Sequence, residues 1–191
     1  MTSSPLPQQE AAPDPVAQPS EYRDLLLGLV GDDDPASVQR ATVTELRRLV
    51  FGDWLALELR TPPAEGEWSM IQLLGHFADS ELVVGTRYRW IVSQDTPELM
   101  PYDQDLWVDR LRHQTAGPAE LLDLFAALRR ANLALWERIP PEERSRYGMH
   151  QERGAESYET TFRIQAGHDR FHLDQARRTV EAVIAMRGQA G

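Results

Sequence analysis

The sequence predicts an all-α protein: a four-helix bundle with a short leading helix and a long crossover between its second and third helices. Four segments space their apolar residues as an α-helix does, and none alternates convincingly at the period of a β-strand. The chain also contains no repeat of fixed period. The four helices would have about 17 to 29 residues each and span roughly 25 to 43 Å, lengths that favour a bundle with one long connection.

The N-terminal part of the chain is expected to contain a tail and two helices. Residues 1–20 are rich in proline and poor in apolar side chains, which predicts a flexible tail, so that residues 21–191 would form a single domain. A short helix is predicted over 21–30, because a glycine and an acidic turn follow it. The first long helix is predicted over about 44–60, ahead of two prolines. Its apolar face would carry Leu46, Leu49, Val50, Trp54 and Leu57.

The second long helix has a clear start signal. Ser69 is followed three residues later by Gln72, which is the pattern of a capping box, so the helix is expected to begin at Ser69. Helical spacing then places one set of side chains on the face that points into the bundle. This set is Leu73, His76, Phe77, Ser80, Val84 and Ile91.

The second half of the chain supplies the crossover and two more helices. Residues 94–117 are predicted to form the crossover, with one short helix in it. The third helix is predicted over 118–139, because it has a proline in its first turn and two prolines after it. Residues 142–157 are polar and contain two glycines, which predicts a loop. The last helix is predicted over 158–186.

Composition excludes several kinds of chemistry. The chain has no cysteine, which removes disulfides, thiolate metal ligands and a cysteine nucleophile. All twenty basic residues are arginine, so a lysine Schiff base and a P-loop lysine are excluded. The net charge of −10 opposes binding to nucleic acid or to an anionic membrane. Neither a secretory signal nor an apolar run long enough for a membrane span is found, so we expect a cytoplasmic protein.

A histidine pair in the last helix is the strongest functional signal. His168 and His172 are four residues apart, so both imidazoles lie on one face of the helix. The predicted inward stripe is Ile164, His168, Phe171, His172, Gln175, Val183 and Met186. Together with His76, the pair makes a three-histidine site that leaves positions open for water or substrate. Such a donor set favours zinc, with nickel or ferrous iron as alternatives, whereas the paired Glu-x-x-His motifs of a di-iron bundle are missing.

Several motifs occur in an order that resembles a known family, the DinB/YfiT-like superfamily of metal-dependent enzymes. They are Glu67-Trp68-Ser69, His76-Phe77-Ala78-Asp79, Pro101-Tyr102-Asp103 with Trp107, and the segment from Gly167 to Gln175. The resemblance covers roughly residues 21–187 and implies a four-helix bundle, usually dimeric. It also implies a divalent metal held by one histidine of the second helix and two of the fourth, here His76, His168 and His172.

The resemblance also implies a range of activities. Relatives include transferases and isomerases that use a low-molecular-weight thiol, bacillithiol or mycothiol, and others described as hydrolases. We therefore expect a metal-dependent thiol S-transferase acting on a small electrophile, as a homodimer. The alternatives are a metal-dependent hydrolase and a non-catalytic metal-binding bundle of a stress response. In the enzyme readings, the metal would lower the pKa of a bound thiol or water and so supply the nucleophile that a cysteine-free chain lacks.

Three further residues are candidates for auxiliary roles. Asp79 lies one turn after His76 and is predicted to be a hydrogen-bond acceptor or general base, or else a solvated residue or the partner of an arginine. Gln175 is expected to hydrogen-bond substrate or metal-bound water, with helix packing as the alternative. His150 could approach the open end of the bundle, but a surface position is favoured because nothing fixes its direction.

Other polar residues are expected to be structural. His113 has no partner at helical spacing and is interpreted as structural or exposed. Asn132 lies on the inner stripe of the third helix and must find hydrogen-bond partners if it is buried. The arginine pairs 129–130 and 177–178 are interpreted as solvated faces.

Overall fold

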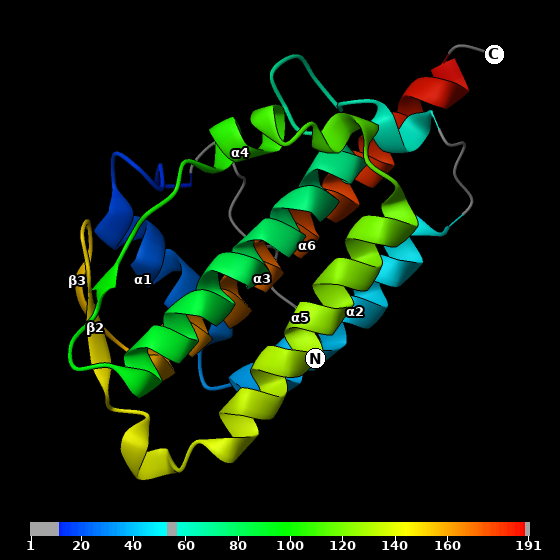
Figure 1. Cartoon of the computed structure of the whole chain (residues 1–191). Coiled ribbons are helices and arrows are strands. Elements are labelled where there is room, and N and C mark those ends of the chain that lie inside the picture. The colour runs from blue at the N-terminus through cyan, green and yellow to red at the C-terminus, as the bar shows by residue number, and fades with distance from the viewer. Residues whose placement is uncertain (1–11, 53–56, 190–191) are drawn as a thin grey trace.

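Four long helices run alongside one another in the computed structural model, which describes residues 12–52 and 57–189 (Figure 1). They are α2 (Pro35–Val50), α3 (Met70–Ser93), α5 (Pro118–Arg138) and α6 (Tyr158–Gln189). Helix α6 packs against α2 and α3, and α5 packs against the same two helices. The prediction of an all-α four-helix bundle is therefore confirmed.

A shorter helix, α1 (Pro19–Val30), packs along the outside of α6. The two backbones approach closely at Gly167: a Cβ atom added there would lie 2.0 Å from the carbonyl oxygen of Leu26. Any larger residue would push α1 away from the bundle, which gives a physical reason for the glycine just before His168. Residues 1–11 of the predicted tail lie outside the described residues.

Helix α3 begins where the sequence predicts. Ser69 is its N-cap, and the side-chain Oε1 of Gln72 accepts a hydrogen bond from the backbone N–H of Ser69 at 3.0 Å. The inward face predicted for this helix, from Leu73 to Ile91, is buried throughout. His76 therefore lies on a helix with a well-defined start and a fixed rotation.

Helix α2 differs from the prediction, which placed it over 44–60. It begins at Pro35, where the carboxylate of Asp34 accepts a hydrogen bond from the backbone N–H of Ser37 at 2.9 Å. The early turns were missed because their buried face carries the polar residues Gln39 and Thr42, which break the apolar period. The helix ends at Val50, a short 3₁₀ helix, η2, follows at Glu58–Arg60, and Trp54 lies outside the described residues.

A small three-stranded sheet was not predicted. Strand β2 (Tyr147–His150) pairs antiparallel with β3 (Gly154–Ser157) and parallel with β1 (Glu98–Leu99), so the loop expected over 142–157 contains a hairpin. Strands of two and four residues are too short for a period of two to stand out. Figure 1 shows the sheet beside α1, at one edge of the bundle.

The crossover between α3 and α5 contains the one short helix that was expected, α4 (Gln104–Arg110), capped by Asp103. Two 3₁₀ turns, η3 (His113–Thr115) and η4 (Pro141–Glu143), complete the connections. Among the described residues, none of the helices combines the length and the apolar character that a membrane span requires.

The core consists of two apolar clusters with a polar layer between them. One cluster includes Phe77 and Phe125, and the other includes Tyr88 and Phe162. On α3, α5 and α6, the residues between these clusters include buried charged and polar side chains. They include Glu81, Arg129, Asn132, Gln165, His168 and Asp169. Of the three candidate ligands, His168 lies in this polar layer, whereas His76 and His172 adjoin residues of the first apolar cluster.

Candidate metal centre

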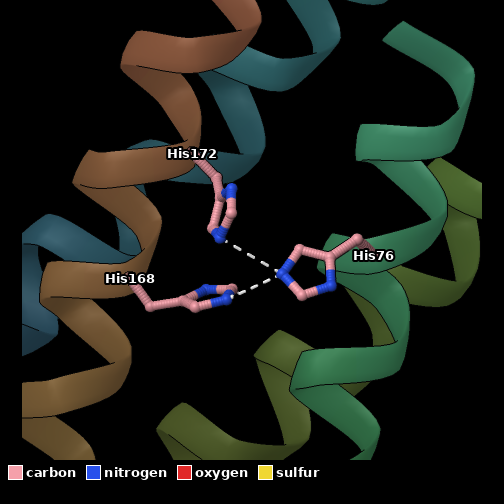
Figure 2. A group of neighbouring side chains, drawn as sticks. All are labelled: His76, His168 and His172. Carbon is pink, nitrogen blue, oxygen red and sulfur yellow. Dashed lines mark hydrogen bonds between the residues drawn. The ribbon is translucent and has the colours of Figure 1, made fainter. Parts of the chain in front are cut away.

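Three buried histidines meet between α3 and α6 (Figure 2). The Nε2 atom of His76 lies 2.9 Å from the Nε2 of His168 and 3.2 Å from the Nε2 of His172. Their exposed fractions are 1%, 8% and 3%, respectively. In Figure 2 the three rings point toward one another, one from α3 and two from successive turns of α6.

Burial keeps these three rings uncharged. It lowers the pKa of His172 to about 4 and holds the pKa values of His76 and His168 well below the ordinary value, with a further decrease in both from the nearby His172. A neutral imidazole has one N–H and one lone pair, so an Nε2–H of His76 would be shared between two acceptors and could point directly at only one of them.

The cluster fits a divalent metal ion. Two imidazole nitrogens bound to one zinc at about 2.1 Å in tetrahedral geometry are roughly 3.4 Å apart, a few tenths of an ångström more than the two separations above. Neutral imidazole is a ligand for zinc, nickel and iron. All three donors lie within 4.8 Å of one another, so only small movements would separate the present arrangement from a coordinated one.

Gln175 orients one of the candidate ligands. Its side-chain Oε1 accepts a hydrogen bond from Nδ1 of His172 at 2.8 Å, which places the ring's lone pair on Nε2, toward the cluster. The contact of Gln175 with substrate or metal-bound water stays a prediction beside this support of the ring. The Nδ1 atoms of His76 and His168 have no hydrogen-bond partner among the residues that the structure describes.

Asp79 does not contact His76. Its Oδ2 lies 2.6 Å from Nε2 of His113, and both side chains are buried. The predicted arginine partner is therefore replaced by a histidine of the crossover. The ring of His113 occupies the space beside Gly75, where an added Cβ would lie 2.3 Å from it. Of the two readings of His113, the structural one is confirmed, because the pair holds η3 against α3.

His150 is buried, so the prediction of a surface position is wrong. Its exposed fraction is 2%, because β2 is paired on both sides and turns alternate side chains inward. His150 lines a cavity that His168 also lines, so the two histidines are neighbours of one space.

Arg129 is also buried, contrary to the prediction of a solvated pair. Its guanidinium donates to both carboxylate oxygens of Asp169 and to Oε2 of Glu81, at 2.8 Å in the latter case. Asn132 finds the partners that were expected, since its amide donates to Glu81 Oε1 at 2.8 Å. Helical spacing with the buried Phe125 and with Asn132 was the signal that could have placed Arg129 inside.

Two cavities flank the histidine cluster. The first, here the His168 cavity, has a volume of about 110 Å³, and the second, the His172 cavity, about 330 Å³. The His168 cavity is lined by polar and basic groups that include Ser80, Arg87, His150, Arg153, Gln165 and His168. The lining of the His172 cavity is aromatic and acidic and includes Asp14, Glu67, Trp68, Asp105, His172 and Gln175. Pro15, Tyr22 and Gln104 border both cavities.

The fold and the site together define a class: a helical bundle whose α3 and α6 bring three buried histidines to one point. The family model of the DinB superfamily matches residues 36–176, and the chain belongs to this superfamily. The resemblance that the sequence motifs indicated is thereby confirmed. The matched range contains all three histidines.

Relatives carry names that state a metal requirement. A protein of Oceanobacillus iheyensis is 28% identical over 117 residues, which are 61% of this chain and 67% of the relative. The YfiT protein of Bacillus subtilis is 32% identical over 71 residues, 37% of this chain and 40% of the relative. Both bear the provisional name of a metal-dependent hydrolase.

A solved structure of Bacillus subtilis YfiT has the same fold. It matches with a TM-score of 0.69 at 21% identity, over 88% of this chain and 89% of that one, and is described as an unusual four-helix bundle topology. At this identity the likeness establishes the fold alone.

Proposed function

We propose that the chain is a metal-dependent enzyme in which His76, His168 and His172 hold a divalent cation, zinc in the first instance. We further propose that it transfers a low-molecular-weight thiol of the bacillithiol or mycothiol type to a small electrophile. The converging neutral imidazoles support the metal. The names of the relatives support a metal-dependent activity. A cytoplasmic homodimer is part of the same proposal, carried over from the sequence.

The observation that carries the transferase proposal is the pair of cavities. His168 lines one and His172 lines the other, so each of these two histidines borders a cavity with a different lining. A reaction between two organic molecules needs two such spaces that meet at the reacting atoms. Hydrolysis needs a cavity for only one organic molecule, because the second reactant is water.

The chain's own residues would prepare this centre for chemistry. Gln175 holds His172 in the tautomer that presents Nε2. The ring of Trp68 stacks on that of His172 with a centroid distance of 6.4 Å and closes one side of the cluster. A divalent ion bound there would act as a Lewis acid and would lower the pKa of a thiol or water.

Metal-dependent hydrolysis is the second candidate, and the names of the relatives favour it. A non-catalytic metal-binding bundle is the third candidate. In that case the ion would mainly stabilise the fold and would need no open coordination position. Cavities on two sides of the cluster favour an accessible centre over this reading.

The test has two stages. Protein purified without a histidine tag is first analysed for metal by mass spectrometry, and about one divalent ion per chain is expected from a three-histidine site. The protein is then offered bacillithiol, mycothiol or glutathione with chlorodinitrobenzene, in parallel with esters and amides without thiol. Thiol-dependent turnover that a chelator abolishes supports the transferase, and thiol-independent turnover supports the hydrolase. Absence of any stoichiometric metal after gentle purification would contradict the whole proposal.

A further inference from the structure

Two residues that line the His168 cavity each have a buried nitrogen donor without a hydrogen-bond partner among the described residues. We propose that this cavity binds the carboxylate of a small organic acid through Arg87 and His150. The bound acid would extend toward His168 and the histidine cluster. Its role as a substrate rests on the proposed function, whereas the binding itself does not.

Arg87 is a buried cation that makes no direct ion pair within the described residues, while the carboxylates of Glu156 and Glu152 favour its charged form from a distance. Its exposed fraction is 8%, and one terminal nitrogen donates to the backbone carbonyl of Met100 at 2.5 Å. Its Nε has no hydrogen-bond partner within the described part of the chain. Burial lowers the pKa of the guanidinium to about 10, which leaves it charged at neutral pH. A buried charge without a partner is costly, and an anionic ligand would offset that cost.

His150 supplies a second donor to the same space. The backbone N–H of Glu152 donates to its Nδ1 at 3.3 Å, so the proton of the neutral ring is on Nε2. That Nε2 is buried and has no hydrogen-bond partner in the ranges 12–52 and 57–189. Arg87 and His150 both line this cavity, and an arginine N–H with an imidazole N–H would match the two oxygens of a carboxylate.

The other arginines that line the cavity already have carboxylate partners, so Arg87 is the cation proposed to bind the ligand's carboxylate. Arg153 is bound through two nitrogens to Glu156, and Arg23 is paired with Asp24 at 3.0 Å. Glu152, an acidic residue of the lining, is exposed, so water screens it. The cavity thus keeps one buried positive charge available for a ligand.

The other residues that line the His168 cavity indicate the size and polarity of the rest of the ligand. Apolar side chains, among them Leu26, Val83, Val84 and Ile164, share the cavity with the two donors. A volume of about 110 Å³ limits the ligand to a small molecule. The His172 cavity instead has carboxylates in its lining and would repel an anion. The two cavities would therefore sort two reactants by charge.

Butyrate and butyramide are suitable probes because they have nearly the same shape and differ in charge. Binding to the full chain is measured by titration calorimetry, once as purified and once after chelator treatment. We expect butyrate to bind in both preparations and butyramide to bind at least about tenfold more weakly, as for loss of a charge-assisted hydrogen bond. Equal affinities for the two probes, or no butyrate binding, would overturn the proposal. The metal measurement is independent, so failure of the carboxylate site is distinguishable from failure of the metal centre.

Variants locate the binding. Arg87→Met and His150→Phe should each weaken butyrate binding, the first by at least about tenfold. Arg23→Met is the matched control, since this arginine lines the same cavity but is already paired, and butyrate affinity should stay within about twofold. Thermal melts check folding, and His150→Phe remains informative if Arg87→Met unfolds the crossover. Unchanged affinity in a folded Arg87→Met or His150→Phe variant contradicts the assignment, as does an equal loss in Arg23→Met.

Discussion

Two buried polar clusters lie between the helices of the same bundle, one made of paired charges and the other of uncharged rings. In the arginine network, defined by Arg129, Glu81 and Asp169, one cation lies between two carboxylates. Thr42 donates to Asp169 at 2.9 Å, and the carbonyl of Gln39 accepts from Arg129 at 2.9 Å. Through these residues, α2, α3, α5 and α6 are joined by groups that satisfy one another.

The histidine cluster, formed by His76, His168 and His172, contains no paired charges. Three neutral rings bring their Nε2 atoms together, and only His172 has a partner at Nδ1 among the described residues. In the arginine network, opposite charges pair and tie four helices together, and the Nε of Arg129 stays without a partner among the described residues. In the histidine cluster, three uncharged rings contact one another through their Nε2 atoms, and no opposite charge is paired with them. Buried atoms without a partner occur in both clusters, so the candidate site is identified by the convergence of three neutral donor rings.

The largest effect expected is on metal binding. His168→Ala removes one of three donors and should abolish stoichiometric metal, while the bundle keeps its helical content because the arginine network remains. Metal analysis and circular dichroism of the tag-free variant give the two measurements. The matched comparison is the His113→Ala variant. His113 is also a buried histidine, but it pairs with Asp79 and not with the cluster. Equal metal loss in both variants would contradict the assignment.

The arginine network should dominate stability. Arg129→Met leaves Glu81 and Asp169 buried without their cation, and the free energy of unfolding should fall by about 3–5 kcal/mol. Urea denaturation of the variant and of the unmodified chain measures this difference in the free energy of unfolding. Arg130→Met is the control, because that neighbouring side chain is exposed and its replacement should change stability by less than about 0.5 kcal/mol. A similar small change in both variants would show that the network does not bear on stability.

A smaller effect is expected from the support of His172. Gln175→Leu removes the acceptor at Nδ1 and should weaken metal affinity by about 10- to 100-fold without removing a ligand. Competition with a chromogenic chelator measures the affinity. Gln165→Leu is a useful comparison, since Gln165 is buried nearby and contacts Ser80 instead of a candidate ligand. Its metal affinity should stay close to that of the unmodified chain.

The sequence predicted the histidine centre better than the arginine network for a physical reason. His168 and His172 are related by local helical spacing, and His76 lies on a helix with a strong start signal. Arg129 also has helical spacing with buried residues, but charged side chains are seldom fully buried unless paired. Its partners, Glu81 and Asp169, come from other helices, so the pairing is visible only in the fold.

The same reasoning explains the missed elements near the site. The start of α2 was predicted too late because Gln39 and Thr42 are polar residues on its buried face. Their contacts with Arg129 and Asp169 come from other helices and are visible only in the fold. Arg87 and His150 are far apart in sequence, and only the pairing of β2 with β1 and β3 brings His150 to the cavity that α3 borders. Periodicity identifies faces of single helices, whereas these contacts depend on how distant segments pack.

The histidine centre should also make the metal-free protein sensitive to acid. Burial lowers the pKa of His172 to about 4 in the folded state, against about 6.5 when unfolded. Between these values the unfolded state binds the extra proton, so the stability that is fully present above pH 6.5 is lost as the pH falls toward 4. The slope from one such histidine is at most about 1.4 kcal/mol per pH unit.

Urea denaturation of chelator-treated protein between pH 7.5 and 4.5 measures this slope. In the His172→Leu variant the decrease below pH 6.5 should be smaller, because one titrating group of the centre is gone. Arg130→Met should leave the slope unchanged, since it alters no group that titrates in this range. An equally steep decrease in the His172→Leu variant would mean that protonation of His172 is not what destabilises the fold in acid.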